Sequence, residues 1–274
     1  VEVSPTLMTA VPRLYEVLHD RIMRGVRNKG GLSEQLFMAA VRLGTKRQQG
    51  KPLLPHEVIL NLIVEKLVRN KVRDRLGGQL KFFISGGAAL NPEIGNFFMA
   101  LGINLLQGYG QTEASPLISA NRPGRIKIET VGPVVSGVDM KIADDGEILV
   151  RGDLLMKGYW RDEAATAAVI QNGWLHTGDL GEVDQEGFIS ITGRKKDIIV
   201  NSGGDNIAPG RVEALLTIEP EIEQAMVDGD KRPWLAAVIV PSEEVRTLAS
   251  SPDALATMVG EAVDRANSRL SQLE

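Results

Sequence analysis

The first third of the chain repeats apolar residues at the spacing of an α-helix in three stretches. The first covers residues 11–27, the second begins at Ser33 and should end at Gly44, and the third covers residues 57–76 and stops at two glycines. Serine is favoured just before a helix, and glycine just after one. Each stretch should therefore form an amphipathic helix that packs its apolar stripe on a core.

Two short apolar runs, at residues 80–84 and 103–106, predict buried strands. A helix should begin between them at Asn91, because asparagine caps helices and the proline and glutamate that follow suit a first turn. This order predicts a βαβ unit, whose ligands normally lie at the carboxyl ends of its strands. Glycine-containing turns at residues 85–89 and 107–116 follow those ends, although neither has the spacing of a dinucleotide fingerprint or a phosphate loop.

Beyond residue 121 short alternating runs between turns predict a layer of β-hairpins. The charged segment at residues 193–197 interrupts apolar strands and has the composition of a domain boundary. Later strands, with helices expected over residues 209–218 and 252–270, predict a small α+β module. The predicted fold is thus α/β and α+β, with one domain over residues 1–193 and another over residues 194–274. Within the first domain, residues 1–120 should be helical and βαβ, and residues 121–193 should be rich in β-strands.

The composition excludes several classes of function. The chain has 274 residues, 43% of them hydrophobic, and a formal net charge of -4, so it offers no overall basic field for nucleic acid. It contains no cysteine, which excludes disulfides, thiolate zinc sites and a cysteine nucleophile, and which fits a reducing cytoplasm. The residues from Val1 to Thr9 lack the pattern of a signal peptide, and no run reaches the ~18 apolar residues of a membrane span.

The turn at residues 107–116 carries chemistry that suits a nucleotide. Its glycines should let the backbone turn tightly after the strand and approach a ligand. Tyr109 offers a stacking face, Thr112 a donor for a phosphate oxygen, and Glu113 a hard oxygen ligand for Mg²⁺. For this segment alone, an ordinary strand-to-loop turn with a surface Thr–Glu pair remains an alternative.

Further motifs stand in order between residues 80 and 209. They are Ser85 to Leu90, Gly108 to Glu113, Gly146 to Gly152, Gly158 to Trp160, Gly173 to Asp179, and Gly193 to Pro209. In this order they resemble the motif series of the adenylate-forming enzymes, which include acyl-CoA synthetases, luciferases and peptide-synthetase adenylation domains. The segment at residues 11–16 and the helical insert after it further resemble the long-chain fatty acyl-CoA ligase branch.

The resemblance implies a nucleotide site with a bound metal. The small residues of the first glycine turn would pack their backbone against adenine, while Tyr109 would cover the other face. Thr112 would hydrogen-bond the phosphate and Glu113 would hold Mg²⁺, which gives both a catalytic role. The implied nucleotide-binding residues are Gly86, Gly87, Ala88, Gly108, Tyr109, Gly110, Gln111, Thr112, Asp179 and Arg194.

Later motif positions have implied roles of their own. Asp179 would accept hydrogen bonds from the ribose hydroxyls, and Arg194 would reach the same ribose or a phosphate. Lys196 occupies the hinge position, where rotation of the small domain would switch the enzyme between two reactions. Gly203 and Gly204 would line the tunnel for the pantetheine of CoA. Each position keeps a structural alternative: a capped turn for Asp179, solvated charges for the basic residues, and a hairpin turn for the glycines.

The implied activity is a ligation in two steps. A fatty acid and ATP would give an acyl-adenylate and pyrophosphate, and CoA would then displace AMP. The substrates would be fatty acid, ATP and CoA, with Mg²⁺ as cofactor and no nucleic-acid partner. We expect a cytoplasmic enzyme, leave peripheral association with the inner face of a membrane open, and predict no oligomeric state. The alternatives are adenylation of another carboxylic acid, or a non-catalytic nucleotide-binding or interaction module on the same scaffold.

Some elements of the family pattern are missing from the sequence. Nothing before Leu80 resembles the glycine-rich loop whose lysine grips the outer phosphates. The catalytic lysine expected on a late loop is also missing, because Lys231, the last lysine of the sequence, matches a turn between strands instead. We therefore expect the sequence to be a portion of a larger enzyme and to be inactive, or nearly so, alone.

Overall fold

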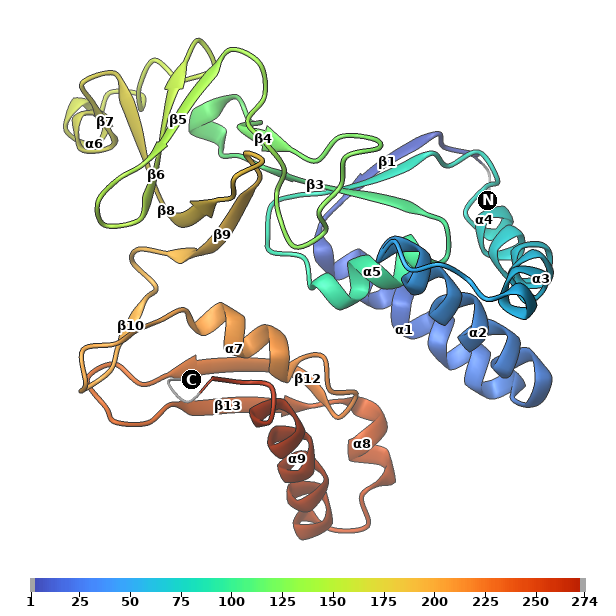
Figure 1. Cartoon of the computed structure of the whole chain (residues 1–274). Coiled ribbons are helices and arrows are strands. Elements are labelled where there is room, and N and C mark those ends of the chain that lie inside the picture. Colours follow the sequence, from blue (N-terminus) through green and yellow to red (C-terminus); the bar gives the residue numbers. More distant parts are fainter. Residues whose placement is uncertain (1–2, 272–274) are drawn as a thin grey trace. The chain divides into compact units, whose positions relative to one another are not determined.

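A computed structural model describes residues 3–271 (Figure 1). The outermost residues of the two predicted domains, 1–2 and 272–274, lie outside the described range. Residues that contact one another form two compact units. The first comprises Val1–Lys141, Leu149–Thr177 and Glu182–Ile191, and the second comprises Ile142–Ile148, Gly178–Gly181 and Thr192–Glu274.

The first unit contains a four-stranded sheet with the order β1-β2-β3-β4. The first three strands are parallel, and β4 runs antiparallel to β3. Helix α5 lies between β2 and β3 in the sequence, which confirms the predicted βαβ unit. Strand β1 was not predicted from the sequence. The bounds are β1 Leu7–Ala10, β2 Phe82–Ser85, α5 Pro92–Ala100, β3 Asn104–Tyr109 and β4 Ser119–Ala120.

Helices pack on this sheet (Figure 1). The core between them is hydrophobic and includes several aromatic side chains. The rings of Tyr15 and Phe83 lie edge to face, 5.2 Å apart, and Phe98 contacts both. The Tyr15 hydroxyl donates to the Ile84 carbonyl at 2.9 Å, and burial raises the pKa of Tyr15 to about 12. Helix α1 is thereby fixed to β2. The helices before β2 are α1 Pro12–Lys29, α2 Gly31–Gln48, α3 Pro55–Val64, the π-helix η1 Glu65–Arg69 and α4 Asn70–Arg75.

The prediction that the second helix ends at Gly44 was wrong, because α2 continues to Gln48. A Cβ atom on Gly44 would lie 2.1 Å from the Ala100 carbonyl oxygen, at the end of α5. Glycine therefore allows two helices to come close together, and this packing requirement replaces the expected role of a helix stop.

A buried arginine joins three helices at the same place. Arg69 donates from Nε to the Ala100 carbonyl at 3.0 Å and from Nη2 to the Ala40 carbonyl at 2.7 Å. Its Nη1 donates to Asn61 at 2.8 Å and forms an ion pair with Glu65 at 3.1 Å. The sequence predicted one continuous helix over residues 57–76, and the π-helical turn that carries Arg69 was missed. π-Helices are rare and occur mostly as single turns inside α-helices.

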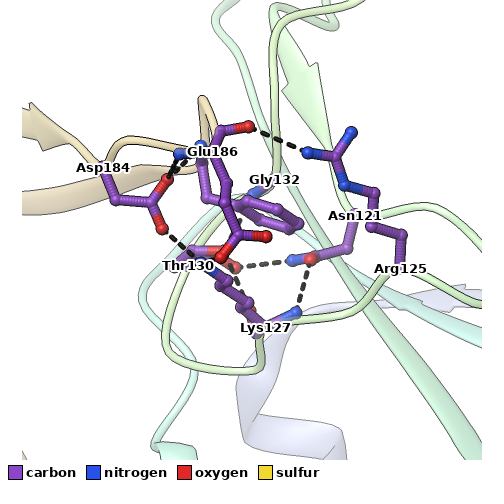
Figure 2. Close-up of polar contacts among 8 residues, drawn as sticks. Asn121, Arg125, Lys127, Thr130, Gly132, Asp184 and Glu186 are labelled. Atoms are coloured by element: carbon purple, nitrogen blue, oxygen red, sulfur yellow. Dashed lines mark hydrogen bonds and ion pairs between the residues drawn. The ribbon is translucent and has the colours of Figure 1, made fainter.

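A loop between β4 and the hairpin layer is fixed by polar contacts (Figure 2). Lys127 donates from Nζ to Asp184 at 2.5 Å and to Glu186 at 2.8 Å, and these bonds raise its pKa. Asn121 closes the loop internally, because its side chain accepts from the Lys127 backbone at 3.0 Å and donates to the Thr130 carbonyl at 2.6 Å. The loop is therefore an ordered connection.

The predicted β-rich layer is confirmed as a five-stranded sheet with the order β5-β6-β8-β7, in which β9 also pairs with β8. The short helix α6 follows Asp162, whose side chain accepts from the Ala165 backbone at 2.8 Å. Strand β9 continues into the charged segment that was expected to separate apolar strands. The bounds are β5 Val138–Ile142, β6 Glu147–Gly152, α6 Glu163–Val169, β7 Ile170–Gln171, β8 Trp174–Val183 and β9 Ile189–Arg194.

The second unit contains two strand pairs, β10–β11 and β12–β13, with helices (Figure 1). Its core joins Val212 and Leu216 of α7 to Ile222 of β12 and Ala262 of α9. The predicted α+β module is confirmed, although α8 was missed. The bounds are β10 Ile199–Val200, β11 Asn206–Ile207, α7 Pro209–Leu216, β12 Ile222–Asp228, β13 Ala236–Pro241, α8 Glu243–Leu248 and α9 Pro252–Asn267.

Candidate functional site

The two predicted glycine turns lie at the same edge of the first unit's sheet. Ser85, the last residue of β2, pairs with Gln107 of the neighbouring strand β3. A Cβ atom on Gly86 would stand 3.5 Å from the Gly108 carbonyl oxygen, so the two segments lie close together. Gly87 has a φ of +83°, and both Gly87 and Ala88 are exposed. The backbone of this turn is therefore open to solvent, and the Val11 side chain lies 3.8 Å from the place that a Cβ atom on Gly87 would occupy.

The second turn begins later than predicted. Strand β3 continues through Gly108 to Tyr109, and the backbone turns only afterwards. A Cβ atom on Gly110 would lie 1.7 Å from the Pro116 carbonyl oxygen, so a side chain there is incompatible with the loop. The Ile118 backbone donates to the Tyr109 carbonyl at 2.8 Å and closes the loop. Gly110 thus permits the tight return that was expected of both glycines.

Residues within this loop are held by contacts from distant segments of the chain. The Gln111 side chain donates to the Thr177 carbonyl at 2.8 Å. Thr112 begins a short 3-10 helix, η2 Thr112–Ala114, and its side chain is exposed. The Met156 backbone donates to the Glu113 carbonyl at 2.8 Å. The loop therefore presents Thr112 to solvent from a fixed backbone.

Glu113 accepts a hydrogen bond from a residue to which the sequence gave no role. The Tyr159 hydroxyl donates to Glu113 Oε1 at 2.8 Å, and this bond raises the pKa of Tyr159. The motif at residues 158–160 was recognised, but the two residues are 46 positions apart, and no local pattern predicts their contact.

No group of three or more His, Cys, Asp or Glu side chains within residues 3–271 could hold a metal ion. Glu113 is therefore a single carboxylate rather than one ligand of a cage. Mg²⁺ is commonly bound by one or two carboxylates together with substrate phosphates and water. The donor set fits a Mg²⁺ ion that arrives with a nucleotide.

Asp179 and Arg194 form an ion pair in the second unit. Arg194 Nε donates to Asp179 Oδ1 at 2.9 Å, and the Asp179 side chain is 7% exposed whereas that of Arg194 is 52% exposed. The carboxylate is thus fixed on strand β8 by a cation from β9. A buried carboxylate of this kind can accept hydrogen bonds from hydroxyl groups in a defined direction.

Lys195, which the sequence did not single out, connects β9 to the β5–β6 turn. Its Nζ donates to Asp145 at 2.5 Å and to the buried Glu147 at 3.2 Å. These bonds raise the pKa of Lys195, and the same contact lowers the pKa of Asp145. Glu147 also accepts from the Gly178 backbone at 2.8 Å. The neighbouring Lys196, the predicted hinge residue, is exposed.

Gly203 and Gly204 lie in a loop that Asn201 organises. Asn201 Oδ1 accepts from the backbones of Gly203 and Asp205, both at 2.9 Å. Gly204 has a φ of +87°, which favours glycine. A turn stabilised by Asn201 therefore explains the conformation of Gly203 and Gly204 without a ligand.

The predicted site residues fall into two groups. Those from Gly86 to Glu113 lie together in the first unit, at the ends of β2 and β3. Those from Asp179 onward lie in the second unit, where Asp179 contacts Arg194. None of the helices in residues 3–271 has the length and apolar character needed to cross a membrane.

Curated relatives are ligases of fatty acids. The long-chain-fatty-acid–CoA ligase FadD15 of Mycobacterium bovis is 38% identical over 289 aligned residues, which include 99% of this chain and 48% of the relative. The chain thus spans about half the length of the curated relatives it matches.

Solved structures of adenylate-forming enzymes share the fold. The o-succinylbenzoate CoA synthetase MenE of Bacillus subtilis, in complex with an acyl-adenylate intermediate, has a TM-score of 0.61 and 30% identity over 71% of this chain and 41% of its own. The adenylation domain of carboxylic acid reductase from Segniliparus rugosus has a TM-score of 0.68 at 21% identity, over 98% of this chain and 40% of its own. This confirms the predicted mixed α/β fold.

Family profiles cover most of the sequence. The profile of the AMP-binding enzyme family matches residues 1–160, and that of the AMP-binding enzyme C-terminal domain matches residues 196–274. The chain belongs to the AMP-binding enzyme family.

Proposed function

We propose that this chain belongs to an AMP-forming ligase that joins a long-chain fatty acid to CoA. The observation that carries the proposal is the meeting of two segments at one sheet edge. The exposed backbone at Gly87 stands beside the strand that delivers Tyr109, Thr112 and Glu113. This arrangement offers a flat surface, a donor and a carboxylate to one ligand, which are the groups that an adenine nucleotide with Mg²⁺ requires.

The first reaction would form an acyl-adenylate. A carboxylate oxygen of the fatty acid attacks the α-phosphorus of ATP, an O–P bond forms, and the bond to the leaving pyrophosphate breaks. Thr112 would donate to a phosphate oxygen as negative charge develops, and Glu113 would hold Mg²⁺, which neutralises phosphate charge when bound. Gly86 and Ala88 would contact adenine, with Tyr109 on its other face.

The remaining nucleotide contacts would come from other segments of the chain. Gly108 and Gly110 would shape the backbone beside the nucleotide, and Gln111 would keep the loop in place. Asp179 would accept from the two ribose hydroxyls, since it is an acceptor fixed by Arg194. Arg194 would then contact the ribose or a phosphate with a group not used in that bond.

The second reaction would form the thioester. The CoA thiol loses its proton to solvent and its sulfur attacks the acyl carbonyl carbon, an S–C bond forms, and AMP leaves with the electron pair of the broken C–O bond. We assign the hinge between the two reactions to Lys196 and the pantetheine path to Gly203 and Gly204. We also propose a domain boundary after residue 193. Lys195, next to the proposed hinge residue, donates a hydrogen bond to Asp145 in the β5–β6 turn.

A long-chain fatty acid is the proposed acid because the curated relatives carry that name. The likeness to a synthetase of o-succinylbenzoate supports a second candidate, an aromatic acid. We propose that the complete gene product works in the cytoplasm, either free or at the inner face of a membrane. Subcellular fractionation would test the location: recovery with secreted material would contradict it.

The test uses the complete gene product with ATP, Mg²⁺, CoA and a panel of acids. Formation of AMP and thioester with hexadecanoate, but not with o-succinylbenzoate, supports the proposal. Asp179→Asn should reduce the rate strongly, whereas the control Asp228→Asn, at an exposed position on β12, should not. Turnover of aromatic acids alone would replace the proposed substrate, and no AMP with any acid would refute the ligase.

A further inference from the structure

The contact between Tyr159 and Glu113 is not explained by any role assigned above. The Tyr159 hydroxyl donates to Glu113 Oε1 at 2.8 Å from a loop that the hairpin layer contributes. The Tyr159 side chain is neither buried in a core nor fully solvated, since the residue is 38% exposed. The hydrogen bond to Glu113 is therefore made by a side chain that is partly open to solvent.

The loop that carries Tyr159 is itself anchored. The Tyr159 backbone donates to Thr166 Oγ1 at 2.9 Å, and the Thr166 hydroxyl donates to the Asp162 carbonyl at 2.8 Å. Gly158 has a φ of +148°, and a Cβ atom there would lie 2.9 Å from Thr166. Helix α6 therefore anchors the backbone of the loop that carries Tyr159.

Glu113 is held from the same loop by its backbone. The Met156 backbone donates to the Glu113 carbonyl at 2.8 Å, three residues before Tyr159. The segment at residues 156–159 thus fixes both the main chain and one carboxylate oxygen of Glu113. An ionised carboxylate has about four lone-pair sites, so a bond at Oε1 leaves Oε2 able to bind a cation.

We propose that Tyr159 is a positioning residue that orients the Glu113 carboxylate toward Mg²⁺. The inference rests on the proposed function, because Glu113 holds a metal only in that account. With the hydroxyl in place, the carboxylate has one orientation before the metal–nucleotide complex arrives. Without it, the carboxylate rotates, and metal binding must order it first. Hydrogen-bond partners of metal ligands commonly change metal affinity by 10- to 100-fold.

The experiment measures metal binding apart from turnover. Complete gene product with Tyr159→Phe is titrated with Mn²⁺ in the presence of α,β-methylene-ATP, and free Mn²⁺ is followed by electron paramagnetic resonance. We expect Mn²⁺ affinity to fall about 10-fold, and AMP affinity without metal to change less than about 2-fold, which is within ~0.4 kcal/mol. Excess Mg²⁺ should restore the rate of pyrophosphate exchange. The control is Trp160→Phe, because Trp160 is 87% exposed on the same loop.

A double-variant comparison separates positioning from a general effect on the loop. In a Glu113→Gln background, Tyr159→Phe should cause no further loss of Mn²⁺ affinity, since the oriented carboxylate is gone. Unchanged Mn²⁺ affinity in Tyr159→Phe overturns the inference, and so does an equal loss of AMP affinity, which would indicate a structural role. If wild-type protein binds neither AMP nor the metal–nucleotide complex, the proposed function fails first and this inference with it.

Discussion

Gly110→Ala should damage the nucleotide loop much more than Gly108→Ala, although the two glycines are neighbours in one motif. A Cβ atom on Gly110 would lie 1.7 Å from the Pro116 carbonyl oxygen and 3.0 Å from the Leu117 Cα atom. Both obstacles are backbone atoms and cannot turn away. At Gly108 the nearest obstacle is the Leu117 Cδ1 atom at 3.2 Å, the end of a flexible side chain.

The size of the effect follows from these distances. Real Cβ atoms essentially never approach within 3.0 Å, so Pro116 must move by about 1.3 Å, the difference between 3.0 and 1.7 Å. Overpacking of this kind costs roughly 1–3 kcal/mol of stability. The loop also carries Thr112 and Glu113, and a misplacement of about 1 Å can cost about 10²-fold in rate.

The assay compares the two variants in the complete gene product by thermal unfolding and by ATP–pyrophosphate exchange. Gly110→Ala should lose about 10²-fold in exchange rate while staying folded, and Gly108→Ala should lose less than about 10-fold. Equal rates for the two variants would refute the reasoning, because the backbone of the loop would then be free to adjust around a side chain.

Three other predictions concern stability and metal dependence. Gly44→Ala should destabilise the protein by about 1–3 kcal/mol in a denaturant titration, because its Cβ atom meets the Ala100 carbonyl at 2.1 Å; Gly25→Ala, with nothing within 4 Å, should be neutral or stabilising by up to about 1 kcal/mol. The folded-state pKa of Tyr15 is raised from 10.0 to about 12, so the stability that protonated Tyr15 contributes is complete below pH 10 and is lost as pH rises toward 12. The free energy of unfolding should therefore fall by up to about 3 kcal/mol over that range. In Tyr15→Phe, this part of the dependence of stability on pH should be absent. Removal of Mg²⁺ by a chelator should stop pyrophosphate exchange by the complete gene product but leave AMP binding, measured by calorimetry, within about 2-fold.

Local patterns predicted much of the fold. Asn91 caps α5 as expected, with its side chain accepting from the Glu93 backbone at 2.8 Å. The strands on either side of α5 were placed to within a few residues, because apolar runs and glycine turns mark them directly. Helix α2 extends beyond Gly44 because the deciding contact, with Ala100, lies far away in the sequence.

The same limit applies to the candidate site. The family pattern marked Glu113 and Asp179 as candidate site residues, but it gave no sign that Tyr159 donates a hydrogen bond to Glu113. Tyr159 and Lys195 each contact a residue about 50 positions away in the sequence. These contacts depend on how the strands and loops pair in space, which the sequence alone does not reveal. A motif therefore indicates which residues are candidates for the site, whereas the structure shows which partners hydrogen-bond to them.

The most direct test of the central claim is calorimetric titration of the complete gene product with AMP. The account predicts binding that Tyr109→Ala and Asp179→Ala each weaken, the latter by about 10²-fold, because hydrogen bonds to a charged group contribute about 1.5–3 kcal/mol. Wild-type binding with both variants unchanged, or no binding by the wild-type protein, would contradict the assignment of these residues to a nucleotide site.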